Sequence, residues 1–203
     1  MVVNKILEYI FSAPSNVTIL RVLNERNVGV SGREVKRLTG LSLRTVQLSL
    51  VNLENTGIVK KITGKRENLF LIDREKFLSK YLVDNIYETE KLFLKEILKV
   101  IRKRISKYCE SIILFGSAAR GDESIKSDLD LCIVYKGKSG IVEEAVSELR
   151  TTLFKIFNIT LAPYYISASD FRKSGKKGKA PLNSIIKEGK LISGKSIKEL
   201  LNG

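Results

Sequence analysis

The chain has 203 residues, a length that allows one large domain or two small ones with buried cores. Hydrophobic residues make up 43% and charged residues 29%, a globular composition that excludes a disordered, collagenous or membrane-spanning chain. The net charge is +14, with 14 basic and 7 acidic side chains in residues 1–80 and 22 and 15 in the rest. A basic excess in both halves indicates contact with phosphates, with a solubility role as the alternative.

The counts of histidine and cysteine limit the kinds of catalytic and metal sites that the chain can form. The chain has no histidine, which excludes Cys/His zinc sites, Ser-His-Asp triads and histidine general bases. Its two cysteines, Cys109 and Cys132, form no C-x-x-C pair and are expected to be small buried hydrophobic side chains. Lys5 and Glu8 interrupt the apolar start of the chain, so no signal peptide is predicted and a cytoplasmic protein is expected.

Signals for two short helices stand out within the first 40 residues. An apolar pattern at residues 19–23 predicts the first of them. Ser31 and Glu34 form a capping box, in which each side chain can satisfy a backbone N–H of the first turn, and Gly40 ends the second helix.

A third helix is predicted over residues 43–55. Ser42 can cap its first turn, and Gly57 provides a left-handed stop after its end. Apolar residues at helical spacing are expected to form a buried stripe: Leu43, Val46, Leu50 and Leu53. The opposite face carries polar side chains: Arg44, Thr45, Gln47 and Asn52.

A β-hairpin is predicted next. Residues 58–62 and 69–72 have strand patterns, and a polar tip separates them. Two helices joined by a short turn and followed by a basic hairpin resemble the winged helix-turn-helix family of DNA-binding domains, over about residues 4–75.

This resemblance implies a way of binding duplex DNA. The third helix would be the recognition helix, with Arg44, Thr45 and Gln47 near its N-terminal end facing base edges. The hairpin would be the wing, with four cations along the phosphates: Lys60, Lys61, Lys65 and Arg66. The alternative is a protein-interaction or dimerisation module whose charged face is solvated.

Residues 74–109 contain neither glycine nor proline and predict a helix. A bend is expected near Asp84 and Asn85, with the second part packed on a C-terminal sheet. The first part could instead pair two subunits, so a homodimer is one hypothesis. The expected organisation is a DNA-binding domain, a helical connector and a second domain, at residues 1–75, 76–90 and 91–203.

The second domain begins with a pattern that favours metal and phosphate binding. An apolar run at residues 112–115 predicts a buried strand, and Gly116 follows it. Residues 127–134 predict another strand, in which alternation places Asp128 and Asp130 on one face. Two such carboxylates are suited to bind Mg²⁺ together with a substrate phosphate, and the small residues after the first strand allow a phosphate to approach the backbone.

The complete motif consists of Gly116-Ser117, Arg120-Gly121 and Ser127-Asp128-Leu129-Asp130-Leu131. It resembles the signature of the DNA polymerase beta superfamily of nucleotidyltransferases, especially its minimal members, over about residues 91–166. The resemblance implies a mixed sheet with flanking helices, so the whole chain is expected to be α+β.

The same resemblance assigns roles to these residues. Gly116 and Ser117 would hold the β/γ-phosphates of an NTP, and Arg120 would lie beside the phosphates or support the loop. Asp128 and Asp130 would be the catalytic pair that binds two Mg²⁺ (or Mn²⁺) ions. The alternative for the two aspartates is a solvated strand start.

One departure from the family pattern concerns a third carboxylate. Active members carry it on a neighbouring strand, where it completes the metal site and can act as a base. The candidate strand, residues 159–166, contains no acid. Asp170 is expected to cap the next helix together with Ser167, and Glu143 lies in the first turn of a helix predicted over residues 141–157, so neither is a convincing substitute.

The last part of the chain is expected to be a cationic loop and a packed tail. Residues 172–179 carry five basic side chains and are expected to be solvated, with phosphate contact as the alternative. Residues 180–203 are expected to pack back as a helix and a terminal turn.

Two functions follow from this organisation. The first is a Mg²⁺-dependent nucleotidyltransferase that binds an NTP, transfers its nucleotidyl group to an unknown acceptor and is directed by DNA. The second is a catalytically inactive DNA-binding transcription regulator, whose C-terminal domain senses a nucleotide or binds a protein partner as an antitoxin does. Neither function involves a membrane.

Overall fold

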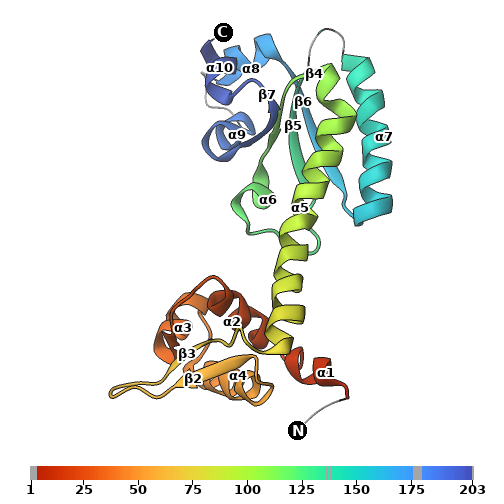
Figure 1. Ribbon diagram of the computed structural model, residues 1–203. Coiled ribbons are helices and arrows are strands. Elements are labelled where there is room, and N and C mark those ends of the chain that lie inside the picture. The colour runs from red at the N-terminus through yellow and green to blue at the C-terminus, as the bar shows by residue number, and fades with distance from the viewer. Residues whose placement is uncertain (1–3, 136, 138, 176–179, 203) are drawn as a thin grey trace. The chain divides into compact units, whose positions relative to one another are not determined.

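The computed structural model describes residues 4–135, 137, 139–175 and 180–202, and its contacts divide it into two compact units, Met1–Leu92 and Phe93–Gly203. Both units combine helices with a small sheet, which confirms the α+β class (Figure 1). In the described part of the chain, no helix has both the length and the apolar character needed to cross a membrane.

The first unit is a winged helix. Its sheet has the order β1-β3-β2, with antiparallel neighbours. The bounds of α4 and of the hairpin agree closely with the sequence prediction, whereas α1 and β1 were not expected. The elements in chain order are α1 (Ile6–Ile10), α2 (Pro14–Asn24), β1 (Val30–Ser31), α3 (Gly32–Thr39), α4 (Leu43–Asn55), β2 (Val59–Ile62) and β3 (Leu69–Ile72).

Side-chain caps begin both helices of the helix-turn-helix. Ser42 Oγ accepts a hydrogen bond from the backbone N–H of Thr45 at 3.1 Å, and Ser31 Oγ accepts one from the N–H of Glu34 at 3.3 Å. The predicted return bond from the Glu34 carboxylate to Ser31 is wrong, because this carboxylate accepts from the Arg37 guanidinium. At Ser31, only the bond accepted by the serine hydroxyl is formed.

The apolar face of α4 lies at the centre of the first core. Val46, Leu50 and Leu53 are buried as predicted. Leu43 is not, because it is the first residue of the helix and lines a surface groove.

The helix predicted over residues 74–109 begins at Phe77, three residues later than expected. A π-helical segment, η1 (Ser79–Val83), leads directly into α5 (Asp84–Ile105), at the place where the sequence predicts a bend. Val83 and Tyr87 are buried in the core of the first unit. The beginning of this helix is thus packed on the winged helix.

The second unit has one four-stranded sheet of order β6-β5-β4-β7, in which only β5 and β6 are parallel. This sheet confirms the mixed sheet that the motif predicts. After α5, the elements are η2 (Ser106–Tyr108), β4 (Cys109–Leu114), α6 (Gly116–Arg120), β5 (Leu129–Tyr135), α7 (Ser139–Phe157), β6 (Leu161–Ser167), α8 (Ala168–Gly175), α9 (Leu182–Glu188), β7 (Lys190–Gly194) and α10 (Ile197–Asn202).

The sheet of the second unit is covered on both faces. Figure 1 shows α5 and α7 on one face and α8, α9 and α10 on the other. The first face of β5 contributes Leu129, Leu131 and Ile133 to a core shared with α5 and α7. The other face contributes Cys132 and Val134 to a second core. Asp130 belongs to this second face by alternation, as the sequence predicts.

Three predictions for the second unit need correction. The strand expected from Ser127 begins at Leu129, because Ser127 forms a turn in which its Oγ accepts from the N–H of Ser124 at 2.9 Å. The tail contains a strand, β7, besides its helices, since it pairs with β4. Of the cationic segment at residues 172–179, Arg172 and Lys173 lie in α8, and Lys176, Lys177 and Lys179 lie outside the described residues.

Candidate functional site

The glycine and the second aspartate of the motif lie against each other. Gly116 begins α6, directly after β4, and has a left-handed φ of 70°. A Cβ on this residue would lie 2.1 Å from Oδ2 of Asp130, so only glycine fits there. The backbone N–H of Phe115 donates to Asp130 O at 3.1 Å and holds the two strand ends in register.

Asp128 acts on Asp130 through its charge. Burial of the Asp130 carboxyl raises its pKa, the negative charge of Asp128 raises it further, and the positive charge of Arg120 opposes both. Asp128 itself is exposed just before β5. Two repelling carboxylates at one strand end would be neutralised by a hard divalent cation with oxygen ligands.

Arg120 is held by two carboxylates of the protein. Its Nε donates to Asp122 Oδ2 at 3.0 Å, and its Nη1 donates to Glu188 Oε2 at 2.9 Å. The first bond ties Arg120 to the turn just after α6, and the second links α6 to the end of α9. Both contacts are consistent with a role of Arg120 in supporting the loop. Ser117 is half-buried within α6, next to Gly116.

The strand paired with Asp130 supplies no third acid. In the parallel pairing of β5 and β6, Asp130 lies next to Ala162. The part of the structure that is described contains no cluster of three or more Asp, Glu, Cys or His side chains able to hold a metal ion. Asp170 accepts from Ser167 Oγ at the far end of β6 and caps α8, as predicted.

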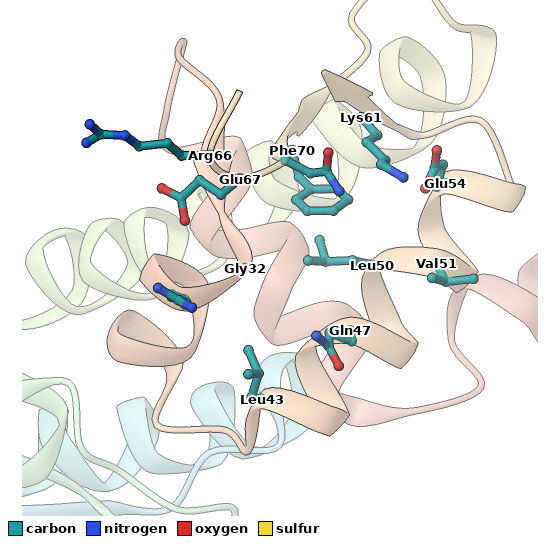
Figure 2. A pocket seen from close by; sticks show the side chains of 12 residues that line it. Gly32, Leu43, Gln47, Leu50, Val51, Glu54, Lys61, Arg66, Glu67 and Phe70 are labelled. Carbon is teal, nitrogen blue, oxygen red and sulfur yellow. The ribbon is translucent and has the colours of Figure 1, made fainter. Parts of the chain in front are cut away.

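A second candidate site lies on the winged helix, in a groove of about 460 Å³ between α4 and the hairpin. Figure 2 shows Gln47 on α4 and Lys61 and Arg66 on the hairpin around this groove. The structure therefore brings together three of the residues predicted to contact DNA. Arg33 from α3 also lines the groove, although no DNA contact was predicted for it from the sequence.

The remaining predicted DNA contacts have different surroundings. Arg44 and Lys65 are exposed, whereas Thr45 is half-buried and lines a separate hollow beside Ser49. Lys60 pairs with Asp73 at 3.4 Å, which partly neutralises one of the four wing cations.

The outer face of α4 also carries apolar side chains that were not singled out from the sequence. Leu48 is 64% exposed and Val51 is 54% exposed. Their positions i+4 and i+7 from Arg44 place them on the same face of the helix, a signal that was available in the sequence.

One protein family matches most of the second unit. Residues 94–190 match the model of the nucleotidyltransferase domain family, which confirms the resemblance drawn from the motif. Comparison with curated proteins gave no match.

Two solved structures are similar to parts of this chain. The transcriptional repressor BigR from Xylella fastidiosa is 20% identical, with 41% of this chain and 81% of that chain covered and a TM-score of 0.35. A toxin-antitoxin structure with AMP-PNP is 19% identical, with 53% of this chain and 80% of that chain covered and a TM-score of 0.37.

Proposed function

We propose that this protein, whose residues 94–190 form a domain of the nucleotidyltransferase family, is a DNA-binding protein that binds an NTP with a divalent cation. The observation that carries the proposal is the position of Asp130 against the backbone of Gly116, with Asp128 beside it. In this arrangement, a phosphate group can approach the backbone at Gly116 close to two carboxylates.

The residues present fit one divalent cation. Asp128 and Asp130 supply hard oxygen ligands, and their mutual repulsion favours a positive ion between them. The absent side chain at Gly116 allows the Asp130 carboxylate to lie directly against the backbone at this point. A bound Mg²⁺ or Mn²⁺ would neutralise charge on the carboxylates and on the triphosphate together.

Other residues of the chain contact the phosphates or support the loop. Gly116 and Ser117 offer a backbone N–H and a hydroxyl to the phosphates. Arg120 holds the loop through Asp122 and Glu188, and it retains N–H groups that these two bonds do not use.

On the winged helix, the groove between α4 and the hairpin would receive the DNA. Gln47 can read base edges, while Lys61 and Arg66 can bind phosphates on either side. Leu48, exposed on α4, can contact a thymine methyl group.

Nucleotide binding is tested by titration calorimetry with an ATP analogue that cannot be cleaved between its α- and β-phosphates. We expect binding that requires Mg²⁺ or Mn²⁺ and is lost in the Asp128→Asn/Asp130→Asn variant. Asp170→Asn is the matched control, because it removes a carboxylate of the same domain at the far end of β6. No binding by the unaltered protein at millimolar analogue would overturn the nucleotide part of the proposal.

DNA binding is tested by fluorescence anisotropy with a mixed-sequence duplex. We expect affinity to fall steeply between about 50 and 200 mM salt, since bound phosphates release counterions. Lys65→Ala/Arg66→Ala should weaken binding to all sequences and reduce the salt dependence by about two contacts. The control is the double variant Lys91→Ala/Lys95→Ala on α5, which removes the same charge. It should leave the affinity and its salt dependence unchanged. Binding that does not depend on salt contradicts the assignment.

A further inference from the structure

We infer that Ala162 restricts the site at Asp128 and Asp130 to a single divalent cation, the one that enters with the nucleotide. This inference rests on the proposed function and deepens it. Its consequence is a domain that retains a nucleoside triphosphate without transferring it.

The register of the sheet provides the geometry. Asp130 and Ala162 are partners in the parallel pairing of β5 and β6, so their side chains lie on the same face, about 5 Å apart at the backbone. On the opposite side, the neighbour of Asp130 is Phe115 at the end of β4. A methyl group and a phenyl ring therefore flank this carboxylate, and neither can bind a cation.

The two acids that the sequence offers as substitutes for a third ligand are too far away or on the wrong face, and the described residues contain no group of three or more Asp, Glu, Cys or His side chains that could hold a metal ion. Asp170 follows Ser167, which is five residues beyond Ala162 along β6, or about 16 Å. Glu143 acts electrostatically on Tyr165, which packs into the core on the α5 and α7 face. Asp130 belongs to the opposite face of the sheet, so Glu143 cannot join it.

Coordination chemistry connects this geometry to the number of cations. Mg²⁺ requires about six oxygen ligands and usually takes one or two carboxylates with phosphates and water. Asp128 and Asp130 supply the two carboxylates that one ion needs. A second ion about 3.5–4 Å away needs a further protein oxygen, and Ala162 occupies the adjacent position from which a strand could supply it.

The lack of an acid at Ala162 also affects proton transfer. An acceptor hydroxyl must lose its proton as it attacks the α-phosphate, and a positioned carboxylate or histidine usually takes it. The chain has no histidine, and Asp130 has no acidic neighbour on either adjacent strand. Because no such proton acceptor is present at Asp130, we expect the domain to bind the NTP without transferring its nucleotidyl group.

The test counts Mn²⁺ ions per bound nucleotide by equilibrium dialysis and electron paramagnetic resonance, with the uncleavable ATP analogue as the probe. We expect one Mn²⁺ per analogue in the unaltered protein and two in Ala162→Asp. Ala162→Asn, which has the same shape without the charge, should remain at one. Ala162 is only half-buried, so the larger side chains can be accommodated.

The possible results separate the two proposals. Two Mn²⁺ ions in the unaltered protein, or a single ion in an Ala162→Asp variant whose circular dichroism is unchanged, would overturn the inference. If Ala162→Asp fails to fold, the count in the unaltered protein still decides. Failure of the unaltered protein to bind the analogue at all would instead refute the proposed function.

A second measurement uses NTP labelled at its α-phosphate. After incubation with Mg²⁺ and the proteins and RNA that copurify with the chain, we expect no label on any macromolecule. Label transfer that is abolished by Asp128→Asn/Asp130→Asn would show that the site is catalytic and would contradict the inference.

Discussion

Gly116 and Asp130 are so close that a Cβ on the glycine would overlap a carboxylate oxygen, at 2.1 Å. The glycine begins α6, just beyond the end of β4, and the aspartate lies on the neighbouring strand β5. This contact connects the two halves of the motif, which are separated by a loop in the sequence.

Gly116→Ala should therefore displace the Asp130 carboxylate. We expect a loss of affinity for the Mn²⁺-bound ATP analogue of about tenfold or more, together with about 1–3 kcal/mol of destabilisation from the positive φ and the clash. Gly121→Ala is the control, since Gly121 has a φ of 80° but no atom within 4 Å of its added Cβ. Equal affinities for the two variants in calorimetry would show that the contact has no role in the site.

The bidentate ion pair between Arg21 and Glu90 should stabilise the first unit in a pH-dependent way. The Arg21 guanidinium holds the pKa of Glu90 below its ordinary value of 4.5. A lowered carboxyl pKa gives stability that is present above pH 4.5 and is lost as the pH falls through the folded-state pKa.

Glu90→Gln should consequently lower the free energy of unfolding by about 0.5–1 kcal/mol at pH 7, and by less as the pH falls below about 4. Urea denaturation at several pH values measures this difference. Glu88→Gln, which affects an exposed pair with Lys91, should have a smaller effect. A pH-independent difference for Glu90→Gln would mean that packing rather than charge is responsible.

Base selectivity should depend on the exposed face of α4. Arg44→Ala or Gln47→Ala should each cost about 1–3 kcal/mol at a preferred site, once a site has been selected from random duplexes, and relax the choice of base there. Lys65→Ala should weaken preferred and other sequences alike. Selection profiles that are identical for all three variants would argue for a solvated face.

Cys132 should be chemically inert in the folded protein. Its side chain is buried, and burial raises the pKa of its thiol to about 12, so almost no thiolate is present near neutral pH. Iodoacetamide labelling at pH 8, followed by mass spectrometry, should modify Cys132 only after denaturation. Rapid labelling of the native protein would show that α8 and α9 do not cover this face of the sheet.

The sequence alone determined the features that depend on neighbouring residues. Ser42 and Gly57 delimit α4 because capping and left-handed turns involve residues only a few positions apart. Alternation along β5 placed Asp130 opposite Leu129 and Leu131 for the same reason. The two halves of the nucleotidyltransferase motif were recognisable because they follow each other closely along the chain.

The tertiary structure decided everything that depends on pairing between distant segments. β1 and β7 are short strands that exist because β3 and β4 offer them hydrogen bonds, and no local pattern announces such strands. The position of Ala162 beside Asp130 and the bond from Arg120 to Glu188 likewise depend on strand register and helix packing. A single-residue slip in register would turn a strand's side chains to the other face, so the sequence could show that an acid is missing, but only the folded sheet could show which residue stands in its place.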